Sequence, residues 1–468
     1  MILGIKIDKN NSGSLCNELI DCLRTKILNG ELLNGDRLPS TRFMANELHI
    51  ARNTVIYAYE QLIAEGYLES RKGSGTYVKL LSDYKLPEKC FEKKLIKNTV
   101  PHPIGNAIVF DTGTPDNTMF PVATWSKALK KACQNASVQS FGYSDITGNR
   151  NLKNALCQYL YRSKGIKCLA QNILIVSGTS GAITLIADSF EKDSRRIALE
   201  DPSIDFVRNI FTYKEYEIYS VPVDDEGMIT TKLKQYCKNK PSLIYTVPSH
   251  QFPTGTILSA SRRMELLKYA VSAGAYIIED DYDSEFNYSK KIVQPLYNID
   301  SEHTIYIGTF SKTFSPAIRL GYMIVPDNLI ERFSEVAEKQ NIRTEMITQL
   351  AMADLINEKL LDRHIYKMKK IYAKKRQHTI SCINKYFKDT ATISGDNAGL
   401  HLLVSFESIY CEEAKLLEYG VSAEFADDYA VNKLKYKNKL ILGYGSLDNN
   451  QIEEGIKSLA SAFQNQLR

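Results

Sequence analysis

Residues 308–316 read GTFSKTFSP and follow a short apolar run, Thr304–Ile307, whose composition predicts a buried strand. This position puts Lys312 among hydroxyl side chains at the carboxyl end of the strand, where α/β proteins bind their ligands. Taken alone, the pattern fits a surface lysine in a loop at least as well. The segments that follow neighbouring strands must therefore decide between the two interpretations.

Two other polar segments also follow predicted buried strands. Asp280 and Tyr282 lie in EDDYD at 279–283, and SGTSG at 177–181 opens an apolar helix. Pyridoxal phosphate needs a lysine for its Schiff base, a carboxylate for the pyridine nitrogen, a phenol near the ring hydroxyl and a phosphate cradle. Arg319 could add a bidentate phosphate contact. A simple strand-to-helix turn remains the alternative interpretation of residues 177–181.

The rest of the chain predicts a multidomain protein. Its 468 residues are enough for two to four domains. Strands and helices alternate over 107–330, which predicts a large α/β domain around a buried, largely parallel sheet. The helix-rich residues 331–468 predict a smaller C-terminal α+β subdomain.

The N-terminal region, residues 12–79, has another pattern. Apolar residues at helical spacing predict helices over 15–27, 42–48 and 52–65, and two short strands at 67–70 and 76–78 flank RKGSG. Three helices and a hairpin predict a winged helix-turn-helix domain. Residues 80–106 show no periodicity and are predicted to be a linker.

Composition limits the functional classes. Hydrophobic residues make up 44% and charged residues 24%, and no apolar run approaches the roughly 18–20 residues that span a bilayer. The N-terminus has no secretion signal, so we expect a cytoplasmic protein without a membrane partner. The nine cysteines form no CxxC motif or Cys/His cluster, which favours reduced thiols and predicts no metal site. The net charge of +5 is too weak to indicate a partner.

Several motifs together carry a family resemblance. Residues 309–322, 279–286 and 249–255 resemble a fold type I aminotransferase, a pyridoxal-phosphate-dependent transferase. Residues 35–40, 52–55, 59–62, 65–67 and 73–78 resemble a GntR-type winged helix. Both halves in this order are similar to the MocR family of bacterial regulators. The resemblance covers nearly the whole chain.

The resemblance implies a role for each matching residue. Lys312 would form the Schiff base with pyridoxal 5'-phosphate, Asp280 would pair with the pyridine nitrogen, and Tyr282 would bond the ring hydroxyl. Arg208 would face the effector. The remaining cofactor contacts would come from the phosphate-binding Thr179, Ser180, Thr309 and Arg319, the ring-stacking Phe206, the cross-subunit Tyr143 and, one residue out of register, Gln251. For Phe206 and Tyr143, ordinary core packing is the alternative.

One position departs from the family pattern. Aminotransferases carry an arginine that binds the substrate carboxylate just before a Leu-Gly-aromatic run. Here the run is Leu442-Gly443-Tyr444, and the place of the arginine falls on Ile441. An apolar side chain cannot pair with a carboxylate, so ordinary transamination of amino acids is in doubt.

The second helix of a helix-turn-helix pair enters the major groove by its N-terminal end. Arginine and asparagine pair bidentately with guanine and adenine edges, and the hairpin tip can reach a phosphate. The expected DNA-binding residues are Arg42, Arg52, Asn53, Thr54, Tyr57, Arg71 and Lys72; solvated surface charges are the alternative. Ala51 stands where related sequences usually have a helix-capping serine.

These observations predict a homodimeric DNA-binding transcription regulator that uses its aminotransferase-like domain to sense a small molecule: an amine, an amino acid or pyridoxal phosphate itself. Two alternatives stay open. One is a working aminotransferase with an accessory DNA-binding head, although Ile441 argues against it. The other is a regulator that senses pyridoxal phosphate and controls vitamin B6 supply, which needs no carboxylate-binding arginine.

Overall fold

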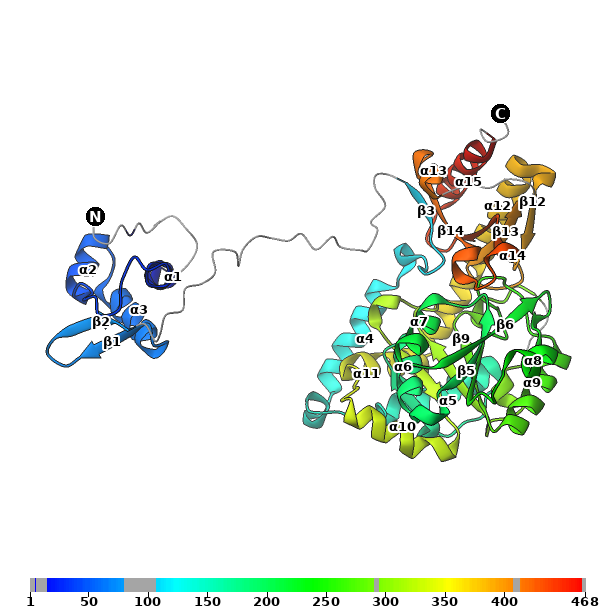
Figure 1. The fold of residues 1–468 in the computed structure, drawn as a ribbon, viewed down its shortest axis with the longest axis horizontal. Coiled ribbons are helices and arrows are strands. Elements are labelled where there is room, and N and C mark those ends of the chain that lie inside the picture. The colour runs from blue at the N-terminus through cyan, green and yellow to red at the C-terminus, as the bar shows by residue number, and fades with distance from the viewer. Residues whose placement is uncertain (1–4, 6–14, 80–106, 290–293, 407–412, 465–468) are drawn as a thin grey trace. The chain divides into compact units, whose positions relative to one another are not determined.

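The computed structural model describes residues 5, 15–79, 107–289, 294–406 and 413–464. The chain divides into two compact units, Met1–Pro101 and His102–Arg468, each with its own core. Figure 1 shows the elements of both units. The predicted linker at 80–106 lies outside the described residues. Within the described residues, no helix is both long enough and apolar enough to cross a membrane.

The N-terminal unit has the predicted winged helix-turn-helix elements. In chain order these are α1 (Leu15–Leu28), α2 (Thr41–Leu48), α3 (Arg52–Ala64) and the antiparallel strands β1 (Leu68–Arg71) and β2 (Gly75–Val78). Apolar residues spaced three or four apart put Leu19, Leu23, Val55 and Leu62 in one fully buried cluster. The core of this unit therefore comes from the residues that gave the sequence its helical periodicity.

The two helices of the helix-turn-helix differ at their N-termini. The Ser40 hydroxyl caps α2 by accepting a hydrogen bond from the Phe43 amide at 3.2 Å. Ala51 stands at the same position of α3, and no side chain caps that helix. Because an uncapped first turn leaves backbone donors without a partner, α3 begins less stably than α2.

An eight-stranded sheet forms the centre of the C-terminal unit, in the order β4-β11-β10-β9-β8-β5-β6-β7. Five consecutive strands of this order, β10, β9, β8, β5 and β6, run parallel to one another. Strand β7 runs antiparallel to β6, and β11 runs antiparallel to both β10 and β4. The strands are β4 (Ile173–Val176), β5 (Arg196–Asp201), β6 (Glu217–Asp224), β7 (Gly227–Met228), β8 (Leu243–Thr246), β9 (Tyr276–Asp281), β10 (Thr304–Thr309) and β11 (Gly321–Ile324).

Both faces of this sheet are buried, because successive side chains of a strand point to opposite faces. In β4, Leu174 and Val176 join one hydrophobic cluster, and Ile173 and Ile175 join another. The first cluster includes α6 (Thr179–Asp188), α7 (Asp205–Tyr213) and α10 (Asp327–Lys339); the opposite face is covered by helices that include α5 (Arg150–Lys164), α9 (Ala260–Ala273) and α11 (Met346–Asn357). Helices on both faces explain the continuous apolar runs of these strands.

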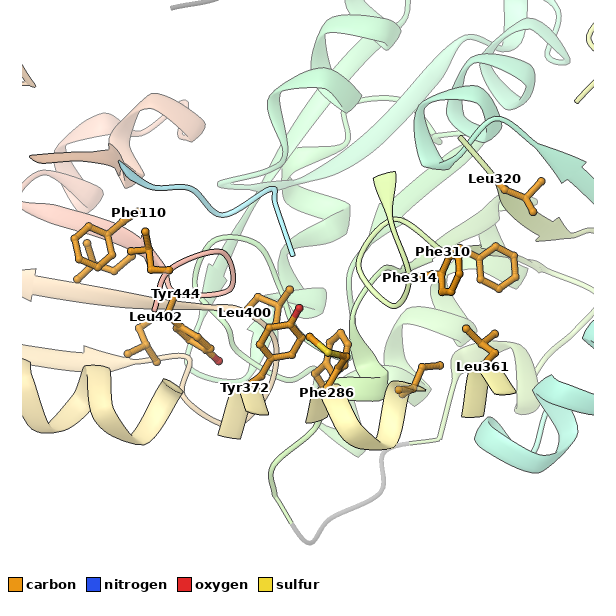
Figure 2. Packing of buried hydrophobic residues seen from close by; sticks show 14 of the residues in the cluster. Phe110, Phe286, Phe310, Phe314, Leu320, Leu361, Tyr372, Leu400, Leu402 and Tyr444 are labelled. Atoms are coloured by element: carbon orange, nitrogen blue, oxygen red, sulfur yellow. The ribbon is translucent and has the colours of Figure 1, made fainter. Parts of the chain in front are cut away.

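A second, five-stranded sheet has the order β12-β13-β15-β14-β3. Its strands are β3 (Ile108–Phe110), β12 (Ala391–Ser394), β13 (His401–Phe406), β14 (Val421–Phe425) and β15 (Lys439–Gly443). The helices α12 (Leu360–Phe387) and α15 (Asn449–Gln464) pack on each other and on this sheet. Figure 2 shows how Phe110, Leu402 and Tyr444 pack beside Tyr372 and Phe286, so that one core continues into the large domain.

The structure differs in one respect from the expected division at residue 330. Strand β3 lies inside the range 107–330, yet it pairs in parallel with β14 as an edge strand of the small sheet. The pairing joins residues more than 300 positions apart in the chain, Ile108 with Val421, which no local pattern can indicate. The remaining helices are α4 (Val122–Asn135), which packs on α11, and the short α8 (Leu233–Tyr236), α13 (Glu413–Glu418) and α14 (Lys433–Tyr436).

Candidate functional site

The candidate site lies where the predicted polar segments leave one edge of the large sheet. Lys312 follows β10, Asp280 lies near the end of the parallel neighbour β9, and Thr179 opens α6 directly after β4. Strand β4 runs in the same direction as β10, because both are antiparallel to β11, which lies between them. The carboxyl ends of all three strands therefore meet at the same edge.

Asp280 is a deeply buried acid at this edge. The phenol of Tyr245 in β8 donates a hydrogen bond to Asp280 Oδ2 at 2.7 Å. Asp280 Oδ1 is buried and has no hydrogen-bond partner among the described residues. Burial raises the pKa of Asp280 to about 7. A buried carboxylate oxygen without a donor is costly unless a ligand supplies one.

Lys312 reaches toward the loop that follows β3. Its Nζ donates a hydrogen bond to the carbonyl oxygen of Gly113. Burial lowers the pKa of Lys312, and the carboxylates of Asp111, Asp283 and Glu424 act in the opposite direction. A lowered pKa increases the fraction of neutral amine, the form that attacks a carbonyl group.

The segment after β4 and the segment after β10 lie together and form the cradle in which an anion could bind. Arg319 Nη2 donates to the Ser177 carbonyl at 2.9 Å and to Ser180 Oγ at 3.3 Å. Thr309 Oγ1 donates to Ser311 Oγ at 3.0 Å on the same side. Backbone amides at the start of α6, next to Thr179, add the partial positive charge of a helix N-terminus.

Backbone geometry holds this cradle in place. Gly178 has a φ of 80°, a conformation that favours glycine. A Cβ at Gly321 would lie 2.9 Å from the Cα of Gly178, so the two backbones approach too closely for a side chain at position 321. Arg319 adopts the left-handed conformation with a φ of 48°. That conformation costs a non-glycine residue roughly 1–2 kcal/mol, which is typical of positions that place a functional side chain.

Tyr282 belongs to a buried network behind Lys312. Its phenol donates to the His250 carbonyl at 3.2 Å, and His250 Nδ1 lies 2.8 Å from Asp283 Oδ2. Burial alone would lower the pKa of His250, but the Asp283 carboxylate outweighs it and raises that pKa. The network fixes the Tyr282 ring beside the edge of the sheet.

The other expected site residues have different environments. Gln251 is buried, and its Nε2 donates to the Pro202 carbonyl at 2.8 Å, so it joins the loops after β5 and β8. Arg208 Nη1 donates to Ser220 Oγ at 3.2 Å, and its Nη2 lies 4.0 Å from Asp201 Oδ1. Phe206 is 37% exposed. The neighbouring Ile204 packs against the cluster that contains Ile441, and so does Tyr282.

Tyr143 is 93% exposed, which rules out the alternative that it packs within the core of its own chain. Its ring lies 5.8 Å from the Arg343 guanidinium, measured between ring centroid and Cζ. The role expected for Tyr143, contact with a neighbouring subunit's phosphate, stays a prediction.

Ile441 is fully buried in the small apolar cluster that includes Phe252 and Leu403. In the small sheet it pairs directly with Glu424 of β14. The sequence did not indicate Glu424, Tyr245 or His250 as site residues. Only Tyr245 had a local signal, since it lies in an apolar strand where a polar tip requires a partner.

The expected DNA-binding residues lie at three places in the N-terminal unit: the first turns of α3, the start of α2 and the hairpin tip. Arg52 and Asn53 are exposed in the first turn of α3, with Thr54 half-buried beside them and Tyr57 67% exposed one turn later. Arg42 is exposed at the start of α2. At the hairpin tip Lys72 is exposed, whereas Arg71 bonds Glu69 at 2.7 Å and lies over the Tyr77 ring.

Comparison with known families matches both units. The family described as "Aminotransferase class I and II" matches residues 106–425, and "Bacterial regulatory proteins, gntR family" matches residues 15–78. Among solved structures, a kynurenine aminotransferase of Pyrococcus horikoshii covers 78% of this chain and 92% of its own, with 23% identity and a TM-score of 0.71. A multiple substrate aminotransferase of Thermococcus profundus covers 83% and 98%, with 24% identity and a TM-score of 0.72. The C-terminal unit therefore has the aminotransferase fold, whose class I and II members depend on pyridoxal phosphate.

Relatives among curated proteins match nearly the full length. The "Probable rhizopine catabolism regulatory protein MocR" of Rhizobium meliloti is 30% identical, covering 98% of this chain and 95% of its own. The "HTH-type pyridoxine biosynthesis transcriptional regulator PdxR" of Corynebacterium glutamicum is 26% identical over 98% of both chains. The chain belongs to the MocR family, the DNA-binding transcription regulators that join a GntR-type helix-turn-helix to an aminotransferase-like domain.

Proposed function

We propose that this regulator binds pyridoxal phosphate at Lys312 and couples the binding of a small amine-containing effector there to its affinity for an operator. The observation that carries the proposal is the buried, unpartnered Oδ1 of Asp280. A pyridinium N–H is a donor that would satisfy this oxygen and would hold the carboxylate in its ionised form.

The neighbouring groups fit the rest of the cofactor. Arg319, Ser180 and the start of α6 would bind the phosphate, and Tyr282 would donate to the ring hydroxyl. Ile204 or Phe206 would cover the ring face. When bound, the cofactor supplies a carbonyl carbon that forms a covalent link with an amine; Lys312 provides that amine within the chain.

Regulation requires that the effector bind two states of the protein with different affinities. Arg52, Asn53, Thr54 and Tyr57 would read the operator from α3, and Arg42, Arg71 and Lys72 would contact its phosphates. Homodimerisation, with Tyr143 crossing to the neighbouring subunit, completes the proposed arrangement. It would match a two-fold symmetric operator.

A colour and labelling experiment tests the cofactor assignment. Full-length protein incubated with pyridoxal phosphate should become yellow, and borohydride should fix the cofactor to the peptide that contains Lys312. Lys312→Ala should abolish this label and retain the fold, because the change removes little packing. Lys339→Ala, at an exposed lysine of α10, is the matched control. Wild-type protein that stays colourless with excess cofactor contradicts the proposal.

Two observations favour a second candidate, a regulator whose effector is pyridoxal phosphate itself. Ile441 offers no charge to an amino-acid carboxylate, and the pyridoxine regulator PdxR is similar over nearly the whole chain. Operator affinity measured with and without the cofactor separates the two. A change caused by pyridoxal phosphate alone supports the second candidate, and a change that requires an added amine supports the first.

A further inference from the structure

We propose that the effector of this site is a cationic amine without a carboxylate group, and that Glu424 binds its ammonium group. This inference rests on the proposed function, because it takes the surroundings of Lys312 as the effector site. It names the chemical class of the effector and one residue that selects it.

Glu424 lies on the face of the small sheet that borders the site. It pairs across β14 and β15 with Ile441, and directly paired residues project from the same face. The neighbour Ala423 points the other way, into the core beneath α12 and α15. Ile441 belongs to one apolar cluster with Phe252, and Tyr282 packs against this cluster. Phe252 and Tyr282 both follow strands of the large sheet at its ligand-binding edge.

The Glu424 carboxylate is held in place by neutral donors. The Thr112 hydroxyl lies 2.9 Å from Oε1 and 3.0 Å from Oε2, and the Tyr429 phenol donates to Oε2 at 2.6 Å. Neutral donors position a carboxylate without cancelling its negative charge. The charge is therefore available to a ligand.

The same loop brings this charge close to Lys312. Thr112 precedes Gly113, whose carbonyl oxygen accepts the hydrogen bond from Lys312 Nζ. Asp111 stands on the other side of the loop, and its Oδ1 accepts the Gly113 amide at 2.6 Å. A Cβ at Gly113 would lie 3.1 Å from this oxygen and 3.9 Å from Lys312 Nζ, so carboxylate and amine border one small space.

This arrangement opposes anionic ligands. A ligand carboxylate beside Lys312 would face Glu424, Asp111 and the apolar Ile441. Arg208, a basic residue expected at the site, bonds Ser220 through Nη1 and faces the Asp201 carboxylate at 4.0 Å through Nη2, although Nη2 makes no hydrogen bond to the described residues. A ligand ammonium group instead gains charge-assisted hydrogen bonds to Glu424.

Two ligands of equal length but opposite terminal charge test the inference. Full-length, pyridoxal-phosphate-loaded protein is titrated by calorimetry with 1,4-diaminobutane and with 4-aminobutanoate. We expect the diamine to bind at least about tenfold more tightly, the effect of one charge-assisted hydrogen bond. Glu424→Gln should remove this preference, and Glu418→Gln, at an exposed glutamate of α13, should retain it.

Equal affinities, tighter binding of 4-aminobutanoate, or no binding of either ligand would overturn the inference. So would a Glu424→Gln protein that keeps the preference. The wild-type comparison needs no variant, so it remains decisive if Glu424→Gln fails to fold. Protein that takes up no pyridoxal phosphate contradicts the proposed function as well, whereas loaded protein without the preference contradicts only this inference.

Discussion

Tyr245 and Asp280 form a buried pair in which a phenol hydrogen satisfies one carboxylate oxygen at 2.7 Å and leaves the other without a donor. The two residues lie on neighbouring parallel strands, β8 and β9, so the sheet itself fixes their distance. Tyr245 thus orients the carboxylate through Oδ2 and leaves Oδ1 able to accept a hydrogen bond from a ligand. This relationship gives the site a measurable dependence on pH.

In the cofactor-free protein, we expect Asp280 to make stability fall as the pH rises. Burial raises its pKa from 3.8 to about 7, so the folded state binds a proton that the unfolded state releases above pH 4. This contribution is fully present below pH 4 and is lost as the pH rises through 7. The difference between these two pKa values sets the upper limit of the contribution at about 4 kcal/mol.

Urea unfolding of wild type and Asp280→Asn at pH 5 and pH 8 checks this prediction. The variant cannot ionise at this position, so its free energy of unfolding should decline less between the two pH values. Glu200 and Glu279 have pKa values raised to about 7 by burial and should affect both proteins alike. Parallel declines in the two proteins would show that Asp280 does not titrate in this range.

The caps of the helix-turn-helix give a second prediction. Ala51→Ser should stabilise α3 by about 0.5–2 kcal/mol, because a serine hydroxyl can accept an amide hydrogen of the first turn. Ser40→Ala should destabilise α2 by a similar amount, because it removes the bond to the Phe43 amide. Hydrogen exchange of the α2 and α3 amides in the full-length protein measures both changes. Unchanged exchange in both variants would contradict the capping argument.

Local patterns in the sequence predicted much of this structure. The three helices and the hairpin of the N-terminal unit lie within a few residues of their expected positions, because each has its own periodicity and end signals. The segments around Lys312, Asp280 and Thr179 were recognised because each follows a buried strand. The residue types in these segments, and the order of the segments along the chain, indicate the family more strongly than the spacing between them.

Contacts between distant segments could not be predicted in this way. Thr112 and Glu424 are separated by 312 positions, and their hydrogen bond depends on the pairing of β3 with β14. The same holds for Tyr245 and Asp280, which become partners only once the strand order is known. Ile204 and Tyr282 pack against one apolar cluster whose members come from five segments of the chain, which no single pattern contains.

Base recognition gives a third prediction. Arg52→Ala should weaken binding to DNA selected by the full-length protein from a random library by about 1–3 kcal/mol. Its affinity for random DNA should change little, since an arginine on a base edge contributes mainly to specificity. Fluorescence anisotropy with both DNAs measures the ratio. An equal loss on selected and random DNA would instead assign Arg52 to the phosphate backbone.

The hairpin tip gives a fourth prediction, about phosphate contacts. Lys72 is exposed, so Lys72→Ala should weaken binding to all sequences and reduce the salt dependence by about one unit of log–log slope. Arg71 is already engaged with Glu69 and Tyr77, so Arg71→Ala should have the smaller effect. Binding measured over a salt series distinguishes the two. A larger change of slope for Arg71→Ala would show that DNA releases it from these partners.

The last prediction concerns the position where aminotransferases bind a carboxylate. With Ile441 at that position, an ordinary amino acid is held at one point, and such misorientation can slow a reaction on the order of 10²-fold. We therefore expect the wild-type protein, loaded with pyridoxal phosphate, to convert amino acids only slowly, seen as a small loss of the visible band over hours.

Ile441→Arg alone should restore little of this rate, because Glu424 pairs directly with residue 441 and would neutralise the new guanidinium. The double variant Ile441→Arg/Glu424→Gln removes that competing charge and leaves the arginine free for a ligand carboxylate. Its conversion rate should exceed that of either single variant by more than the product of their separate effects. Absorption spectra recorded over time with one amino acid, for the wild type, both single variants and the double variant, measure this coupling. The midpoint of thermal unfolding of each variant controls for the cost of a charge in an apolar cluster. If the two substitutions change the rate independently, Glu424 does not reach position 441. Steady multiple turnover by the wild-type protein would show instead that the protein acts as an aminotransferase without an arginine at this position.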